Sequence, residues 1–108
     1  MVAEMDAAKV DKVFVTQTKM WSYRNKKMTM DTRLEEVDQY LTHSPDRFVG
    51  LAGYDPFRIS ESLAEIEHAV KHRGYKGVYV HIYGFDIGFA DAKMYPLYAK
   101  CAELGVPV

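Results

Sequence analysis

The sequence predicts an α/β fold in which helices alternate with parallel strands. Short runs rich in β-branched and apolar residues recur along the chain as KVFVTQT, RFVGLAG and KGVYVHIY. Between these runs, apolar residues stand three or four apart, which is the spacing of one helix face. Each strand and helix together take roughly thirty residues, the size of a βαβ unit. Such alternation is typical of parallel strands joined by right-handed helical crossovers.

The first third of the chain is expected to hold one helix, one strand and one loop. Residues 2–9 form a helix with Val2, Met5 and Ala8 on one face. Residues 12–18 form a strand, and residues 19–30 form a loop because they show no clean period. The loop is basic, and its cations either attract a carboxylate or are solvated charges: Lys19, Arg24, Lys26 and Lys27.

The middle of the chain is expected to contain two helices on either side of a strand at residues 47–53. Thr32 with Glu35, and Ser62 with Glu65, have the spacing of capping boxes at the helix starts. The first helix ends at Ser44-Pro45, and Gly74 ends the second. The inward-facing stripes are Leu34, Val37 and Leu41 in the first helix, and Leu63, Ile66, Ala69 and Val70 in the second.

The last third is expected to form a strand at residues 76–83, a glycine-containing loop and a further helix. Asp91 caps this helix, Pro96 lies in its first turn, and Gly105 ends it. Residues 106–108 begin a fourth strand. The apolar stripe of the helix is Met94, Leu97, Tyr98, Cys101 and Leu104.

Length and composition limit the classes of protein to which the chain can belong. With 108 residues and a formal charge of −1, it is expected to form one domain that does not bind nucleic acid. No apolar stretch approaches the roughly 18 residues that a membrane span needs, so no membrane association is expected. Cys101 is the only cysteine, and we expect a reducing, cytoplasmic location.

Motifs and length favour part of a barrel over a nucleotide-binding sheet. No GxGxxG follows the first strand, and no GxxxxGK[ST] occurs. A (β/α)8 TIM barrel needs about 250 residues, so this chain supplies about three to four parallel βα units of one. Met1 leads directly into a helical pattern and Val108 stops within an expected strand. We therefore expect residues 1–108 to be a fragment of a single barrel domain.

Candidate functional residues lie where the strands end, because the active face of parallel α/β folds is at the carboxyl ends of the strands. Four residues there are expected to contact a small-molecule substrate: His81, Tyr83, Tyr54 and Asp55. Alternation along the strand places Tyr79, His81 and Tyr83 on one face, away from the aliphatic residues Val78, Val80 and Ile82. For Asp55, a turn role is the alternative.

Three interpretations of His81 remain open: a substrate contact, a metal ligand or a structural histidine. A lone histidine is a weak metal site, because catalytic zinc usually takes three protein ligands. His68 and His72 share a helix face but are expected to be solvated. Cys101 lies on an apolar stripe and is expected to be a core residue.

Three stretches together resemble the amidohydrolase-related family of the amidohydrolase superfamily: SPDRFVGLAGYDP, HAVKHRGYKGVYVHIYG and MYPLYAKCAELGVPV. The resemblance extends from Met5 to Val108. It implies a TIM barrel holding a divalent metal, with zinc as the expected ion, and an enzyme that acts as a hydrolase or decarboxylase. The metal activates water or orients the substrate. The family's metal ligands match no residue here, whereas His81 matches a strand-end position facing the pocket.

The resulting hypothesis is a segment of a metal-dependent amidohydrolase-family enzyme acting on a small carboxylated or cyclic substrate. The segment itself is expected to be inactive and to bind no metal, and its catalytic residues are unknown. The alternative is a non-enzymatic α/β module that binds a partner or self-associates as a homo-oligomer, because an open barrel leaves sheet edges and apolar faces uncovered.

Overall fold

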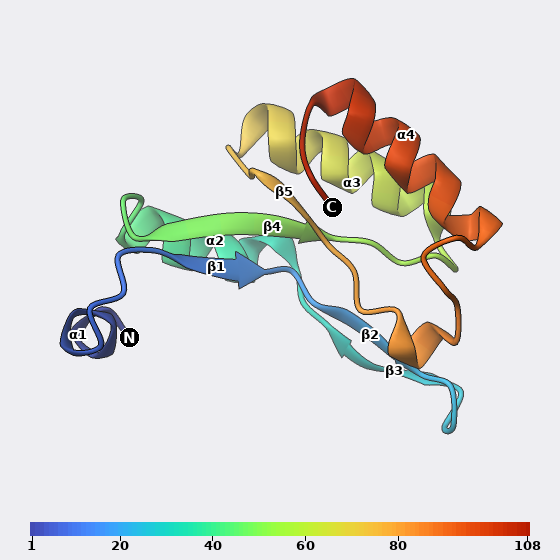
Figure 1. Cartoon of the computed structure of the whole chain (residues 1–108), viewed down its shortest axis with the longest axis horizontal. Coiled ribbons are helices and arrows are strands. Elements are labelled where there is room, and N and C mark those ends of the chain that lie inside the picture. The colour runs from blue at the N-terminus through green and yellow to red at the C-terminus, as the bar shows by residue number, and fades with distance from the viewer.

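Three parallel strands form the centre of the molecule, which is described over all 108 residues by a computed structural model (Figure 1). They are β1 (Val13–Thr16), β4 (Phe48–Gly53) and β5 (Gly77–Tyr79), in the spatial order β1-β4-β5. Both neighbouring pairs are parallel. Helices α2 (Leu34–His43) and α3 (Ile59–His72) make the crossovers. The predicted α/β class, with a parallel sheet, is confirmed.

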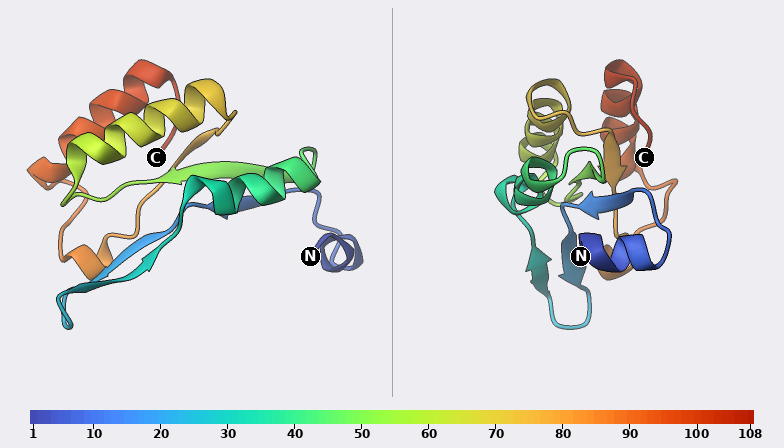
Figure 2. Two further views of the ribbon diagram at one scale, coloured as in Figure 1. Left: turned by 180° about the vertical axis from the view of Figure 1, so that it is seen from behind. Right: turned by 90° about the vertical axis from the view of Figure 1, so that its left-hand side faces the viewer.

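Helices α2, α3 and α4 (Tyr95–Leu104) pack around the sheet on the side of Ala52 and Val78 (Figures 1 and 2). The predicted helix stripes are confirmed, since each contributes to one core. The buried members of this core are Leu34, Val37, Ala52, Tyr54, Ile66, Ala69, Tyr75, Val78, Met94, Leu97 and Cys101. Phe14 alternates with the core-packed Val15 on β1 and therefore faces the opposite side of the sheet, where it is 67% exposed.

Helix α1 (Val2–Ala7) lies at the amino end of the sheet, beside the start of β1 (Figure 1). Arg47 holds this segment in place. Its guanidinium donates hydrogen bonds to Val10 O at 2.8 Å and Asp11 O at 2.6 Å, and forms an ion pair with Asp6 at 2.8 Å. No helix of the chain has the length and apolarity to cross a bilayer.

The prediction of a basic loop at 19–30 is wrong, because these residues form an antiparallel hairpin. Strand β2 (Lys19–Ser22) pairs with β3 (Lys27–Asp31) around a tight turn. The register shifts between Met20 and Trp21, which is a β-bulge or irregularity. Such a shift breaks the alternation that identifies a strand in a sequence. In Figure 1 the hairpin extends beyond the carboxyl end of the parallel sheet.

Both predicted capping boxes are displaced. Helix α2 begins one residue later than expected, with Arg33 N donating to Glu36 Oε2 at 3.2 Å in place of the Thr32 and Glu35 pair. Helix α3 begins at Ile59, so Ser62 and Glu65 lie inside it. The S/T-x-x-E pattern is short, and it occurs within helices as well as at their starts.

The third parallel strand is shorter than the predicted range of 76–83. Strand β5 ends at Tyr79, and a 3-10 turn, η1 (Tyr83–Phe85), follows. Residues 106–108 do not form the predicted fourth strand. They lie beside β5, because Val78 N donates a hydrogen bond to Pro107 O at 3.0 Å.

The predicted end of the last helix at Gly105 is confirmed, whereas the α-helix begins at Tyr95, after a 3-10 turn that Asp91 caps. Asp91 accepts a hydrogen bond from Lys93 N at 2.9 Å and caps η2 (Ala92–Met94), which continues into α4. Pro96 lies in the first turn of α4. Gly105 follows with φ +70° and Gly74 follows α3 with φ +73°, a region that favours glycine.

Candidate functional site

The carboxyl ends of β1, β4 and β5 meet at one edge of the sheet, and Gln17 joins the first two. Its side chain is fully buried, and its Oε1 accepts a hydrogen bond from Gly53 N at 2.8 Å. Its Nε2 donates to Glu65 Oε1 of α3 at 2.6 Å. A side chain at position 53 would overlap the carbonyl oxygen of Gln17, so only glycine fits. This part of the site is therefore rigidly held.

An aromatic cluster joins the loops that follow the three strands. Phe57, after β4, makes edge-to-face contacts with Trp21 of the hairpin and with Phe85, after β5. The ring centroids are 5.5 Å and 5.3 Å apart. Gly84 lies directly against the Trp21 backbone. Such aromatic pairs stabilise beyond their buried area, so the loops support one another.

A cavity of about 730 Å³ opens at the end of β5, between that strand and the loop behind η1. We call it the β5-end cavity. It contains two of the four residues expected to contact substrate, His81 and Tyr83, whose ring centroids are 6.1 Å apart. Its lining residues are Tyr79, Val80, His81, Ile82, Tyr83, Asp86, Ile87, Gly88 and Phe89.

His81 has one ring nitrogen with no partner inside the chain. Its Nδ1 is buried and makes no hydrogen bond. Buried polar atoms are nearly always paired, and leaving one unpaired costs about 1–3 kcal/mol. Imidazole nitrogens donate or accept hydrogen bonds according to tautomer. The chain itself covers this nitrogen, so an outside group pairs with it only if the covering residues move.

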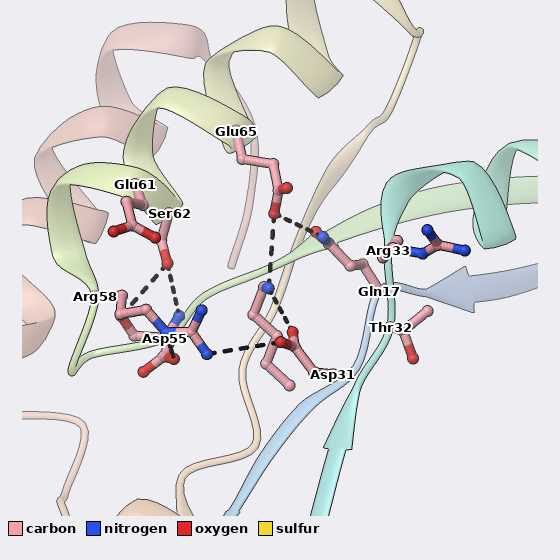
Figure 3. A pocket seen from close by; sticks show the side chains of 10 residues that line it. Gln17, Asp31, Thr32, Arg33, Asp55, Arg58, Glu61, Ser62 and Glu65 are labelled. Carbon is pink, nitrogen blue, oxygen red and sulfur yellow. Dashed lines mark hydrogen bonds and ion pairs between the residues drawn. The ribbon is translucent and has the colours of Figure 1, made fainter. Parts of the chain in front are cut away.

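A second, polar pocket of about 200 Å³ lies between the hairpin and α3 (Figure 3). Lys19 lines it and forms ion pairs with Asp31 at 2.9 Å and Glu65 at 3.7 Å. The hydrogen bond from Lys19 lowers the pKa of Asp31 below its usual value. The Lys19 side chain is only 12% exposed, so for this residue the solvated-charge interpretation is wrong. Arg24, Lys26 and Lys27 are exposed.

Asp55 lines the polar pocket, but its carboxylate is already occupied. Oδ1 accepts from Phe57 N at 2.9 Å, and Oδ2 accepts from Arg58 Nε at 3.2 Å. Its backbone N–H donates to Ser62 Oγ at 3.1 Å. The aspartate therefore builds the turn that follows β4, which is the alternative role given by its Asp-Pro sequence.

Tyr54 lies in the core and lines neither cavity. Its ring is fully buried, and its hydroxyl donates to Lys93 O at 2.6 Å. Burial, with a smaller effect of the Asp55 charge, raises the pKa of Tyr54 to about 12. Of the four predicted residues, only His81 and Tyr83 line the β5-end cavity.

The chain holds no group of three histidine, cysteine or carboxylate side chains that could bind a metal ion. His68 and His72 are exposed on α3 with ring centroids 5.3 Å apart, and Arg73 Nε lies 3.0 Å from His68 Nε2. Cys101 is buried, which raises the pKa of its thiol. The donor set of these residues does not fit a catalytic metal.

Comparison with known proteins places this geometry in a family. The family model described as "Amidohydrolase" matches residues 17–108, which include the carboxyl ends of β4 and β5, the residues that follow β1, and both cavities. The chain belongs to the amidohydrolase family. No curated protein matches the chain.

The solved structures that the chain resembles include decarboxylases. 5-Carboxyvanillate decarboxylase from Novosphingobium aromaticivorans, complexed with manganese and 4-hydroxy-3-methoxy-5-nitrobenzoic acid, matches 98% of this chain with a TM-score of 0.78 and 22% identity. The chain covers 32% of that protein. The match with 2,6-dihydroxybenzoate decarboxylase from Rhizobium covers 98% of this chain and 36% of that protein, with a TM-score of 0.72 and 18% identity. The amidohydrolase chain thus spans about a third of the length of these structures. Its fold matches the corresponding part of their TIM barrel.

The polar pocket is the feature of this amidohydrolase chain that sequence reasoning missed. Asp31 ends β3, whereas Arg58 precedes α3 and Glu65 lies within it, and no local pattern joins Asp31 to the other two. One signal was present in the sequence: Gln17 and Lys19 follow the first strand, at the edge where polar side chains gather in parallel sheets.

Proposed function

We propose that residues 1–108 are a segment of a single barrel domain in a metal-dependent amidohydrolase-family enzyme. The whole enzyme removes carboxylate from a small aromatic acid, or hydrolyses a related cyclic substrate. Membership of the family supports this proposal, as does the fold shared with aromatic-acid decarboxylases. Coverage of about a third of those structures supports the view that further barrel units complete the site.

The observation that carries the proposal is the place of His81 and Tyr83, which both line the β5-end cavity. In parallel α/β folds, substrates bind at the carboxyl ends of the strands, and the cavity lies at the end of β5. His81 and Tyr83 therefore contact the substrate. Tyr54 and Asp55 act indirectly, because their hydrogen bonds with Lys93 O and Phe57 N fix the loop after β4.

The divalent metal of the proposed enzyme is held by residues outside this chain, because the donor set within it does not fit. Zinc was the expected ion, whereas manganese is present in one similar decarboxylase, and both remain candidates. The metal supplies Lewis acidity or an activated water when bound. The residues of this chain position the substrate beside it and carry no metal-dependent step.

Metal analysis and activity of the 108-residue chain test this proposal. The chain is incubated with Zn²⁺ or Mn²⁺, desalted and analysed for bound metal, and carbon dioxide release from 2,6-dihydroxybenzoate is then measured. We expect less than stoichiometric metal and no turnover. Tightly bound stoichiometric metal with turnover would show that the chain holds a complete site and would contradict the proposal.

The alternative function is a module that self-associates through the uncovered side of the sheet. The exposure of Phe14 supports it, because its register partner Val49 shares that face. Light scattering coupled to size exclusion distinguishes the two functions. A concentration-independent dimer that Phe14→Lys dissociates would favour the module, whereas a monomer would count against it.

A further inference from the structure

We propose that the carboxyl-terminal end of α3 carries a surface site for a transition-metal dication such as Zn²⁺ or Ni²⁺, with His68 and His72 as its two protein ligands. The inference goes beyond the proposed function, because this site takes no part in the reaction. Three observations lead to it: the spacing of the two rings, the lone pair of His68 Nε2, and the charges beside the pair.

The two imidazoles lie one helical turn apart on the same face of α3. Their ring centroids are 5.3 Å apart, and their planes are inclined by 40°. A metal bonded at about 2.0–2.1 Å to a ring nitrogen lies roughly 3.2 Å from that ring's centroid, so two imidazoles at a tetrahedral angle have centroids about 5.2 Å apart. Histidines at positions i and i+4 of a helix bind zinc together for the same reason. Both side chains are exposed, so water can complete the coordination.

His68 presents a nitrogen that carries a lone pair. Arg73 Nε donates a hydrogen bond to His68 Nε2 at 3.0 Å. A guanidinium has donors only, so the nitrogen that accepts from it is unprotonated, and the imidazole is neutral with its proton on Nδ1. The neutral imidazole is the form that binds metals. The chain thus holds His68 in the tautomer that a metal at Nε2 requires.

A metal at His68 Nε2 replaces the hydrogen bond from Arg73, and the arginine has other partners. Its Nη1 pairs with Asp38, and its Nη2 lies 3.8 Å from Glu35 Oε1. Both carboxylates belong to α2, so Arg73 can stay on that helix when it releases the histidine. The loss is one exposed hydrogen bond, which lowers metal affinity about threefold to tenfold.

The charges beside the pair do not repel a dication. Lys71 pairs with Glu67 at 3.3 Å, and Arg73 pairs with the two carboxylates of α2. A dication that approaches the rings therefore meets neutralised cations. Both histidines also lie towards the carboxyl end of α3, where the helix dipole favours positive charge.

The donor set predicts which metals bind. Imidazole suits Zn²⁺ and Ni²⁺, whereas Mn²⁺ prefers carboxylate oxygens and water. Two ligands on an exposed surface hold a metal more weakly than the three ligands of a catalytic zinc site. We therefore expect a site that exchanges its metal, loses it on desalting and rejects Mn²⁺. This end of α3 lies near the start of β5, away from the end of the sheet where the hairpin extends (Figure 1).

Titration of the 108-residue chain, prepared without a histidine tag, with Ni²⁺, Zn²⁺ and Mn²⁺ tests the inference. Isothermal titration calorimetry gives the dissociation constants, and thermal melts show whether the metal stabilises the folded chain. We expect one Ni²⁺ or Zn²⁺ per chain. Ni²⁺ at about a hundredfold above its dissociation constant should raise the melting temperature by at least about 3 °C, and Mn²⁺ should not.

Single variants assign the ligands. His68→Gln and His72→Gln should each weaken Ni²⁺ binding at least about tenfold, because each removes one of two ligands. His43→Gln removes an exposed histidine of α2 and is the matched control, which should leave Ni²⁺ affinity unchanged. Arg73→Met removes the donor that competes for Nε2 and should strengthen binding about threefold to tenfold.

The outcomes distinguish this inference from the proposed function. Unchanged Ni²⁺ affinity in His68→Gln or in His72→Gln, or Mn²⁺ bound as tightly as Ni²⁺, overturns the inference. An Arg73→Met variant that binds Ni²⁺ more weakly also overturns it, because His68 Nε2 would then not be the ligand. The proposed function is tested separately, by metal that survives desalting and by turnover.

Discussion

Gly84 packs against Trp21 so closely that a Cβ on the glycine would overlap the Trp21 carbonyl oxygen. The contact joins η1 to the β2–β3 hairpin through two residues that are more than sixty positions apart in the chain. It sets the path of the chain between His81 and Asp86. The shape of the β5-end cavity therefore depends on a backbone contact with the hairpin.

Gly84→Ala should destabilise the chain by about 1–3 kcal/mol, the usual effect of forcing atoms into a packed contact. Urea denaturation measures the change in the free energy of unfolding. Gly88→Ala is the matched control, because a Cβ there meets nothing within 4 Å, and should change stability by less than about 0.5 kcal/mol. Equal stability of the two variants would show that the hairpin does not dock on η1.

Gln17→Leu should cost about 1–3 kcal/mol, because it leaves the buried Gly53 N–H without an acceptor. The substitution also removes the hydrogen bond to Glu65. Denaturant unfolding of the variant gives the loss directly. Gln39→Leu, at an exposed position of α2, is the control and should be nearly neutral. A Gln17 variant as stable as its control would remove the proposed link between β1, β4 and α3.

Lys19→Met should lower stability near neutral pH by about 0.2–1 kcal/mol, a value that allows for solvent screening at the exposed Asp31. The folded chain holds the pKa of Asp31 below its ordinary value of about 3.9. That stabilisation is present above the ordinary value and is lost as pH falls through the lower, folded-state pKa. The difference in the free energy of unfolding between the variant and the parent should therefore become smaller below about pH 4. Lys27→Met, in the same hairpin but without an ion pair, should show no such pH dependence.

Tyr54→Phe should alter the alkaline stability of the chain. The folded-state pKa of about 12 exceeds the ordinary value of about 10, because the ring is buried. The stabilisation from neutral Tyr54 is therefore complete below about pH 10 and is lost as pH rises through about 12. Thermal melts from pH 9 upward should show a difference in melting temperature between parent and variant that becomes smaller as pH rises. Tyr95→Phe changes an exposed tyrosine and should differ from the parent by the same amount at every pH. If that difference also narrowed with pH, the alkaline effect could not be assigned to Tyr54.

The helices and the parallel sheet could be predicted because their evidence is periodic and local. Val37, Ile66 and Leu97 each belong to a stripe with helical spacing, and each is buried in the core. The hairpin could not be predicted from alternation, because the register shift at Trp21 interrupts it.

The site was only partly predictable, because pairing between distant elements leaves no mark on a local pattern. The alternation correctly predicted that Val78, Val80 and Ile82 pack in or against the core, although β5 ends at Tyr79. Lys19, by contrast, has the same local context as the exposed Lys27. Only the fold brings Glu65 and Asp31 to it.

The ring cluster of Trp21, Phe57 and Phe85 has a spectroscopic consequence. The chain contains one tryptophan, and that residue touches the loops behind two of the parallel strands. Its emission therefore reports the docking of the hairpin without any label. A ligand that rearranges residues 83–89 would shift the wavelength of maximum emission. Loosening of α1 at the far end of the sheet would leave that wavelength unchanged.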